Sequence, residues 1–226
     1  MATAKNIQNH GATGVGSRLA EGAAQTLIDS ACRTELKSAR HLCRPLNFAD
    51  MGHVAMLLKA EILDPGVARE ILRKLLQFDR EVSFETISWD PSHGDVYENR
   101  LRVLKTRLAD CAGHISTGRA RREAATVAWQ IACRELLVQL GMELADLGDA
   151  MLQMASARQD VYMPDFTYLH HAHPTTAAHF FLGYLYPFVR DLSRLRRALD
   201  LINRSPAGSG SVNGSRLPLD RLYIAE

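Results

Sequence analysis

The sequence predicts an all-α protein, in which an N-terminal domain of short helices precedes two long helices of an incomplete helical bundle. Apolar residues recur at helical spacing through the first half of the chain, and two heptad seams run through the second half. The composition agrees, because 226 residues with 46% hydrophobic and 23% charged side chains are enough to bury a sizeable core. Disorder over most of the length is therefore excluded.

The first half is divided by local signals. Gly, Ala, Thr and Asn dominate the opening, so residues 1–18 are predicted to form a flexible tail. Residues 19–110 are predicted to form the helical N-terminal domain. Asp64 followed by Pro65 supplies an N-cap that separates two helices, and the segment 86–95 is predicted to be a loop. The helical spacing of apolar residues is clearest at Val54, Leu57, Leu58, Ile62, Val67, Ile71, Leu72 and Leu75.

The second half, residues 111–226, is predicted to be part of a bundle. One long helix is expected from about Arg121 to Ala157, and a second one is expected to be kinked near Pro187. Between them, residues 162–174 are predicted to be turn-rich. Two helices about 45 Å long cannot close an apolar core by themselves, so an oligomer is expected. The seams are Leu137, Leu140, Leu144, Leu147, Met151 and Met154, then Phe181, Leu185, Phe188, Leu192, Leu195, Leu199 and Ile202.

Composition excludes several classes of function. A net charge of +2 from 27 basic and 25 acidic residues does not predict nucleic-acid binding. No apolar run approaches the roughly 18 residues of a membrane span, and the opening lacks the core of a signal peptide, so a cytoplasmic protein is expected. The four cysteines contain no C-x-x-C pair and are predicted to be reduced thiols. No cofactor is expected.

Three segments carry candidate chemistry, each with an alternative interpretation. Residues 116–122, Ser-Thr-Gly-Arg-Ala-Arg-Arg, begin the long helix and can bind an anion, or they are a helix cap followed by solvated arginines. The glycine loop 205–215 either faces a ligand or is a linker. Four histidines lie between His170 and His179, but their spacing does not match a metal motif, and a polar turn lining a cleft is the preferred interpretation.

Taken in order, these segments resemble argininosuccinate lyase, of the fumarase/aspartase superfamily. The resemblance rests on residues 116–122 before a long helix, on residues 163–174 between helices, and on Ser-Pro-Ala-Gly-Ser-Gly at 205–210 near Asp220-Arg221. Upstream, Asp29-Ser30 stands at the family's Asn-x-Ser, and residues 53–57 resemble a helix of its N-terminal domain. The resemblance covers the N-terminal half of a family member only, and it implies that the C-terminal half of the family fold is absent.

The resemblance implies a set of site residues. Ser30, Thr117, Arg121 and Thr167 stand at positions that contact substrate in the family. Arg119, Arg122 and His170 are candidates for the same role, and no metal is implied. Arg122 stands where the family motif Gly-Arg-Ser-Arg-Asn-Asp has its substrate-binding asparagine, with Ala120 and Glu123 at the serine and aspartate positions. Tyr168 stands at the proton-transferring histidine of Thr-His-Leu-Gln and is the candidate catalytic residue.

The resemblance also implies an activity, a C–N lyase reaction of arginine biosynthesis. It is the β-elimination of an N-succinyl substrate of the argininosuccinate type to fumarate and an amine or guanidine. Family members are homotetramers whose active sites combine three subunits, and a serine in a flexible Gly-Ser-Ser-x-Met-Pro loop is the base. That loop is not among the 226 residues, so a second lyase-like chain supplying it is expected, in a homotetramer-like or hetero-oligomeric assembly. The alternative is a catalytically inert homologue with a structural or regulatory role.

Overall fold

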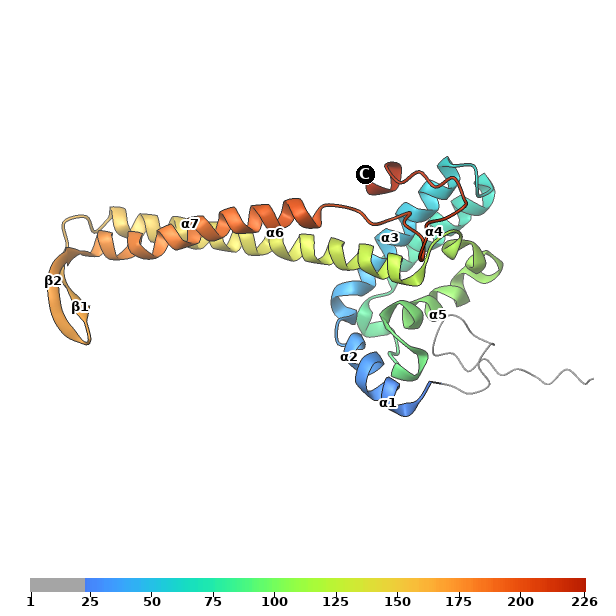
Figure 1. Ribbon diagram of the computed structural model, residues 1–226, viewed down its shortest axis with the longest axis horizontal. Helices are drawn as coiled ribbons and strands as arrows, with labels where there is room; N and C mark the ends of the chain where they lie inside the picture. The colour runs from blue at the N-terminus through green and yellow to red at the C-terminus, as the bar shows by residue number, and fades with distance from the viewer. Residues whose placement is uncertain (1–22) are drawn as a thin grey trace, which may run out of the picture. The chain divides into compact units, whose positions relative to one another are not determined.

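A computed structural model describes residues 23–226, and it confirms the predicted helical class (Figure 1). The tail predicted for residues 1–18 lies outside the described residues. The chain divides into two compact units. We call them the helical unit, which comprises residues 23–132 together with 205–226 among those described, and the long-helix unit, which comprises residues 133–204. One helix, α6, begins in the first unit and ends in the second.

The helical unit is built from consecutive helices joined by short turns. The predicted cap at Asp64 is confirmed, because its Oδ1 accepts hydrogen bonds from the backbone N–H groups of Gly66 (2.8 Å) and Val67 (3.2 Å). The segment predicted as a loop at 86–95 contains a short 3₁₀ turn at Pro91–His93. The helices are α1 (Gln25–Leu27), α2 (Arg33–Leu36), α3 (Ala39–Lys59), α4 (Pro65–Glu81), α5 (Val96–Leu108) and the first turns of α6 (Arg121–Ser156).

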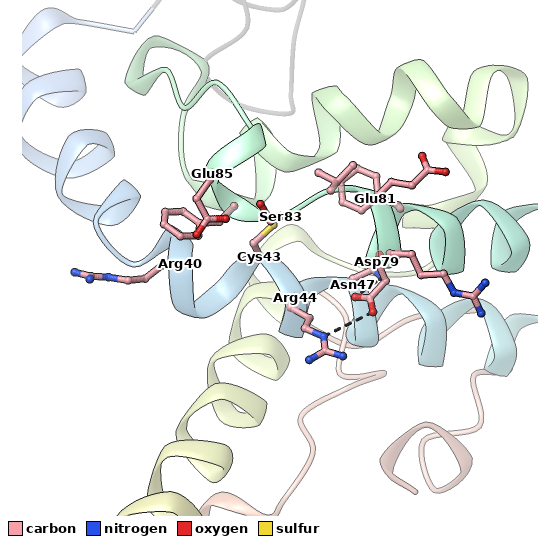
Figure 2. Close-up of a pocket in the computed structure, with 12 residues that line it drawn as sticks. Arg40, Cys43, Arg44, Asn47, Asp79, Glu81, Ser83 and Glu85 are labelled. Carbon is pink, nitrogen blue, oxygen red and sulfur yellow. Dashed lines mark hydrogen bonds and ion pairs between the residues drawn. The ribbon is translucent and has the colours of Figure 1, made fainter.

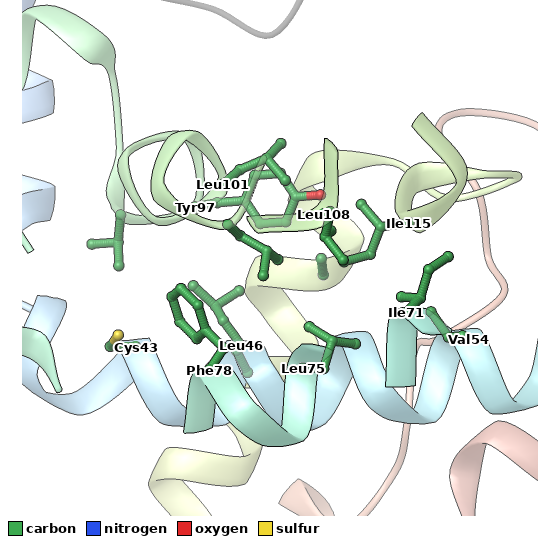
Figure 3. Packing of buried hydrophobic residues seen from close by; sticks show 14 of the residues in the cluster. Cys43, Leu46, Val54, Ile71, Leu75, Phe78, Tyr97, Leu101, Leu108 and Ile115 are labelled. Carbon is green, nitrogen blue, oxygen red and sulfur yellow. The ribbon is translucent and has the colours of Figure 1, made fainter. Parts of the chain in front are cut away.

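The core of the helical unit lies between α3, α4 and α5 (Figure 3). Val54, Leu57, Ile71 and Leu75, which the helical spacing selected, have no exposed surface. Because residues three and four apart share one face of a helix, the sequence pattern and the buried face coincide. This core supports the segment that leads into α6, where Ile115 is also buried.

The long-helix unit contains the rest of α6, a two-stranded sheet and α7 (Ala177–Ile202). All seven residues of the predicted second seam are half-buried, so α7 turns this seam toward α6. On α6 the predicted seam divides, since Leu137, Leu144 and Met151 are half-buried whereas Leu140, Leu147 and Met154 are exposed. Part of the apolar surface of these helices is therefore left uncovered by the described residues.

The segment between the two long helices is more regular than the predicted turn. β1 (Tyr162–Thr167) and β2 (His170–Thr176) form an antiparallel hairpin, with Thr167 paired to His170 and an irregularity between Pro164 and Phe166. The connecting residues Tyr168 and Leu169 both have positive φ, 47° and 65°. Two-residue hairpin turns of this kind usually contain Asn-Gly, and Tyr-Leu gives no such signal. The sequence therefore did not reveal the hairpin.

Among the described residues, no helix combines the length and the apolar character that crossing a membrane requires.

Candidate functional site

The predicted anion-binding segment lies at the entry to α6 and is held by the core beneath it. Thr117 ends a 3₁₀ segment, and its carbonyl oxygen accepts a hydrogen bond from Nε2 of the buried His53 at 2.9 Å. Gly118 follows with φ of 68°, where a Cβ atom would lie 2.9 Å from a methyl carbon of Leu217. The positive φ favours glycine here, whereas the Leu217 methyl group stands at the end of a flexible side chain that can move aside. The segment therefore has a fixed path into the helix.

Arg119 anchors this segment through a buried charge cluster. Its guanidinium group pairs with Asp50 on α3, and Asp50 also accepts a hydrogen bond from Arg100 on α5 at 2.5 Å. The three side chains are 3%, 1% and 0% exposed. Burial alone raises the pKa of Asp50, but the two guanidinium groups outweigh burial and hold this pKa below its ordinary value. Arg119 was a candidate substrate contact, but its side chain is buried. It holds the segment in place through its ion pair with Asp50.

Arg121 and Arg122 are the arginines that reach the surface. Arg121 Nη1 lies 3.0 Å from Asp95 Oδ2, and the Arg121 side chain is 31% exposed. Arg122 is 67% exposed, and both of its terminal nitrogens lie 3.2 Å from Glu35 Oε1. Asp95 also caps α5 by accepting from the N–H of Glu98. Two cations, each oriented by a carboxylate, thus stand at the N-terminus of α6, where the helix dipole also favours anions.

Ser30, the other site candidate of the helical unit, lies in the π-helical turn between α1 and α2. Its hydroxyl group donates to the carbonyl of Thr26 at 2.6 Å, and the residue is exposed. The neighbouring Asp29 pairs with Arg33 along the same helical stretch. Ser30 is therefore exposed to solvent, and its hydroxyl group already donates a hydrogen bond within the same helical stretch.

The glycine loop binds an anion, and that anion belongs to the chain itself. Glu123, at the start of α6, accepts hydrogen bonds from the N–H groups of Gly208 (2.7 Å) and Gly210 (2.8 Å), one on each carboxylate oxygen. Both glycines have positive φ, and a Cβ atom at Gly210 would lie 2.7 Å from the Gly214 carbonyl carbon. Neither predicted interpretation of the loop, ligand-facing or linker, included this contact. These two hydrogen bonds hold the loop against the start of α6, and we call the loop, residues 205–215, the strap.

We expect Glu123→Gln to loosen this strap, because the amide offers one acceptor oxygen where the carboxylate offers two. The peptide containing residues 205–215 should exchange its backbone hydrogens about tenfold faster or more, as measured by hydrogen–deuterium exchange mass spectrometry. Glu135→Gln, an exposed change on the same helix, is the matched control and should leave this peptide unchanged. If this peptide exchanged its backbone hydrogens at the same rate in both variants, Glu123 would not be what holds the loop.

The remaining site candidates lie on the hairpin of the long-helix unit. Thr167 and His170 flank its turn, and Tyr168 at the tip is 94% exposed. Within residues 23–226, no three histidine, cysteine or acidic side chains converge to hold a metal ion, and this includes the histidines from His170 to His179. The candidates thus fall into two groups, one in each unit.

The helical unit also contains a hollow that no sequence motif indicated. It encloses about 330 Å³ between α3 and residues 78–85, and Figure 2 shows the side chains that line it. Cys43 is buried there, and this burial raises the pKa of its thiol. Arg44 lies 3.6 Å from Asp79, at the edge of the same hollow. Cations and carboxylates alternate around it, so its charge selects no single class of ligand.

Sequence reasoning missed the carboxylates that position the site. Asp50, Asp95 and Glu35 were not singled out, and His53 entered only as part of a helix. For Asp50 and His53 a signal existed, since a carboxylate and a histidine three residues apart occur on an otherwise apolar helical face. Their partners could not be found this way, because these lie 50 to 69 residues further along the chain.

A helical domain holds an arginine-bearing segment at the start of the first of two long helices, α6 and α7. Similarity to known proteins identifies the class that this arrangement defines. Residues 58–226 match the protein family described as Lyase, and the chain belongs to this lyase family.

The resemblance to argininosuccinate lyase is confirmed at the level of sequence similarity. The chain is 34% identical over 176 residues to argininosuccinate lyase of a Sulfurihydrogenibium species, which covers 78% of this chain and 38% of that enzyme. This chain therefore spans less than half the length of that relative.

Solved structures share the fold of this chain. A class II fumarase from Schistosoma mansoni superposes with a TM-score of 0.72 at 14% identity, over 94% of this chain and 50% of the fumarase. An EDDS lyase variant with bound fumarate gives 0.71 at 20% identity, over 90% of this chain and 40% of the lyase. At these identities the likeness concerns the fold alone, and it agrees with the predicted helical class.

Proposed function

We propose that this protein is a C–N lyase that acts on argininosuccinate or a related N-succinyl compound. The observation that carries the proposal is the pair of accessible guanidinium groups, Arg121 and Arg122, at the N-terminus of α6 beside Thr117. A succinyl group has two carboxylates, and two oriented cations at a helix N-terminus match that charge. The sequence similarity to argininosuccinate lyases and the fumarate bound to the EDDS lyase variant support the same class of substrate.

The proposed reaction is a β-elimination. A base removes a proton from the succinyl carbon, the carbon–nitrogen bond breaks with its electron pair going to nitrogen, and fumarate and the free amine or guanidine are released. Negative charge that develops on the adjacent carboxylate is stabilised by Arg121, Arg122 and Thr117. The serine loop that provides the base comes from polypeptide outside the 226 residues, and Tyr168 takes part in proton transfer at the position of the family histidine.

The site is proposed to assemble from several subunits. The hairpin with Thr167, Tyr168 and His170 belongs to the long-helix unit, and its tip is exposed. Exposed Leu140, Leu147 and other apolar side chains of α6 leave surface that a further helical subunit would cover. Native mass spectrometry of the protein from its own source tests this assembly. A stable oligomer is expected, and a monomer at micromolar concentration would contradict it.

Arg121→Ala tests the binding half of the proposal. We expect it to weaken the binding of succinate or fumarate more than about tenfold, since a charge-assisted contact is lost. Isothermal titration calorimetry measures the change in Kd. Arg73→Ala, an exposed arginine of α4, is the control and should bind as the unmodified protein does. Unchanged binding in Arg121→Ala would leave this arginine as a structural partner of Asp95.

A catalytically inert homologue is the second candidate, and two observations favour it. Tyr168 replaces the family histidine, and Arg122 replaces the family asparagine. The experiment is to measure fumarate formation from N-succinyl substrates by the assembled protein with and without Tyr168→Phe. A fall of about tenfold or more supports catalysis through the hydroxyl group. The absence of turnover with any succinyl amine supports the inert role.

A further inference from the structure

A hollow of about 360 Å³ opens beside the two surface arginines. It lies between α3, the start of α5 and the first turns of α6, all within the helical unit. Asp95, the partner of Arg121, and Arg122 itself stand on its wall, so the hollow adjoins the proposed dicarboxylate site. Its volume is within the range of small-ligand sites. The rest of its lining is largely apolar: Leu42, Leu46, Val96, Tyr97, Ala125 and Trp129.

One carboxylate at this hollow retains an open acceptor. Both terminal nitrogens of Arg122 contact Glu35 Oε1, whereas Oε2 of Glu35 has no hydrogen-bond partner among residues 23–226. The Glu35 side chain is 38% exposed. A cation can therefore approach Oε2 without displacing Arg122.

The apolar wall also has an open aromatic face. Leu46, Val96 and Tyr97 at the base of the hollow are nearly fully buried, but Trp129 on α6 is 53% exposed. An indole ring at the mouth of an apolar hollow attracts both hydrocarbon groups and cations. The wall thus favours a ligand that joins an apolar group to a positive charge.

We propose that this hollow receives the amine portion of the substrate and that the amine carries an apolar group, such as a benzyl or a branched alkyl chain. The inference rests on the proposed lyase function and specifies its substrate class. The succinyl carboxylates lie against Arg121 and Arg122, the ammonium group lies against Glu35 Oε2, and the hydrocarbon fills the hollow. Besides Glu35, the acceptors of the lining are Asp95, which already pairs with Arg121, and the hydroxyl groups of Ser38 and Thr126. The guanidinium of an arginine product has up to five N–H donors, more than these groups can satisfy.

The amine is the leaving group in this arrangement. The proton removed from the succinyl carbon goes to the base, and the electron pair of the broken carbon–nitrogen bond goes to nitrogen. The ammonium group of the substrate therefore leaves as a neutral primary amine with the two hydrogens that it already carried, and it takes up a further proton from solvent. Glu35 binds the ammonium of the substrate and of the reprotonated product, and it neither gains nor loses a proton over the cycle. Glu35 is thus a specificity residue.

Binding of amines in the presence of saturating succinate tests the proposal without requiring turnover. We expect benzylamine to bind about tenfold or more tightly than methylamine, because the ring is buried in the hollow, and more tightly than arginine. Titration calorimetry gives the Kd values, and quenching of tryptophan fluorescence reports contact with Trp129.

Two variants and one control identify the place of binding. Glu35→Gln keeps an acceptor for Arg122 but removes the charge, and it should weaken benzylamine about tenfold. Ala125→Leu fills the hollow and should abolish the preference for benzylamine over methylamine while succinate binding is retained. Glu61→Gln, an exposed change in the turn after α3, should leave the binding of both amines unchanged. Circular dichroism verifies that each variant is folded.

The outcomes separate this inference from the lyase function. The amine site is overturned if benzylamine and methylamine bind equally well. It is also overturned if Glu35→Gln and Ala125→Leu leave benzylamine binding unchanged. Both conclusions hold even if fumarate is formed from argininosuccinate. Benzylamine binding that depends on both residues, without fumarate formation from any N-succinyl amine, supports the site and overturns the lyase function.

Discussion

Asp50→Asn is expected to destabilise the helical unit by about 3–5 kcal/mol, because it leaves the buried guanidinium groups of Arg100 and Arg119 without their negative partner. The amide is close in size to the carboxylate, so packing is preserved and the electrostatic effect is isolated. Urea unfolding followed by tryptophan fluorescence measures the free energy of unfolding. Both tryptophans, Trp89 and Trp129, lie in the helical unit and report on it directly.

Glu70→Gln is the matched control for Asp50→Asn. Glu70 pairs with Lys74 one turn further along α4, and both belong to the helical unit, but its side chain is exposed. The free energy of unfolding of this variant should be close to that of the unmodified protein. A change of less than about 1 kcal/mol in Asp50→Asn would show that the buried cluster is not held together by this charge.

His53 is expected to make the helical unit less stable as the pH falls from about 6.5 to 4. Burial lowers the pKa of His53 to about 4, the positive charge of Arg119 acts in the same direction, and the Thr117 carbonyl and Asp50 oppose them. Across this window the unfolded chain binds a proton that the folded chain does not bind. The free energy of unfolding therefore falls by up to about 3 kcal/mol as the pH is lowered.

His53→Gln separates this effect from the other titrating groups. The Gln amide can donate to the Thr117 carbonyl as the imidazole Nε2 does, but it does not titrate. Unfolding in urea at several pH values should show a smaller slope between pH 6.5 and 4 in the variant. Asp50, whose pKa lies below its ordinary value, adds its own loss of stability only at lower pH, below about 4. An unchanged slope in the variant would mean that His53 is already protonated in the folded state.

Contacts of charged side chains with residues far along the chain could not be predicted from the sequence. Glu123 reaches Gly208, which lies 85 residues further along the chain, and Arg119 reaches back 69 residues to Asp50. Arg119 and Gly208 lie in segments that the sequence singled out, but each was considered with solvent or a ligand as its partner, and Asp50 was not singled out at all. A charge pattern shows that a carboxylate or a guanidinium needs a partner and does not show which one.

The buried face was predicted correctly for α7 but only in part for α6. The heptad seam of α7 was predicted residue by residue, because a single apolar stripe leaves one choice of buried face. On α6 the apolar residues occupy a broader surface, so the pattern did not distinguish Leu144, which packs within the chain, from Leu140 and Leu147, which are exposed. Which of them face α7 depends on where the hairpin returns the chain.

By itself the sequence determined the helical class, the long helix from Arg121, the capped start of α4 at Asp64 and the family resemblance. These features depend on residues close together in the chain, whose spacing fixes which side chains share a face or a cap. Only the tertiary structure decided that Arg119 is buried against Asp50, that the glycine loop is strapped by Glu123, and that an apolar hollow adjoins Arg122. These depend on contacts between segments distant in sequence, which exist only after α3, α5 and α6 have packed together.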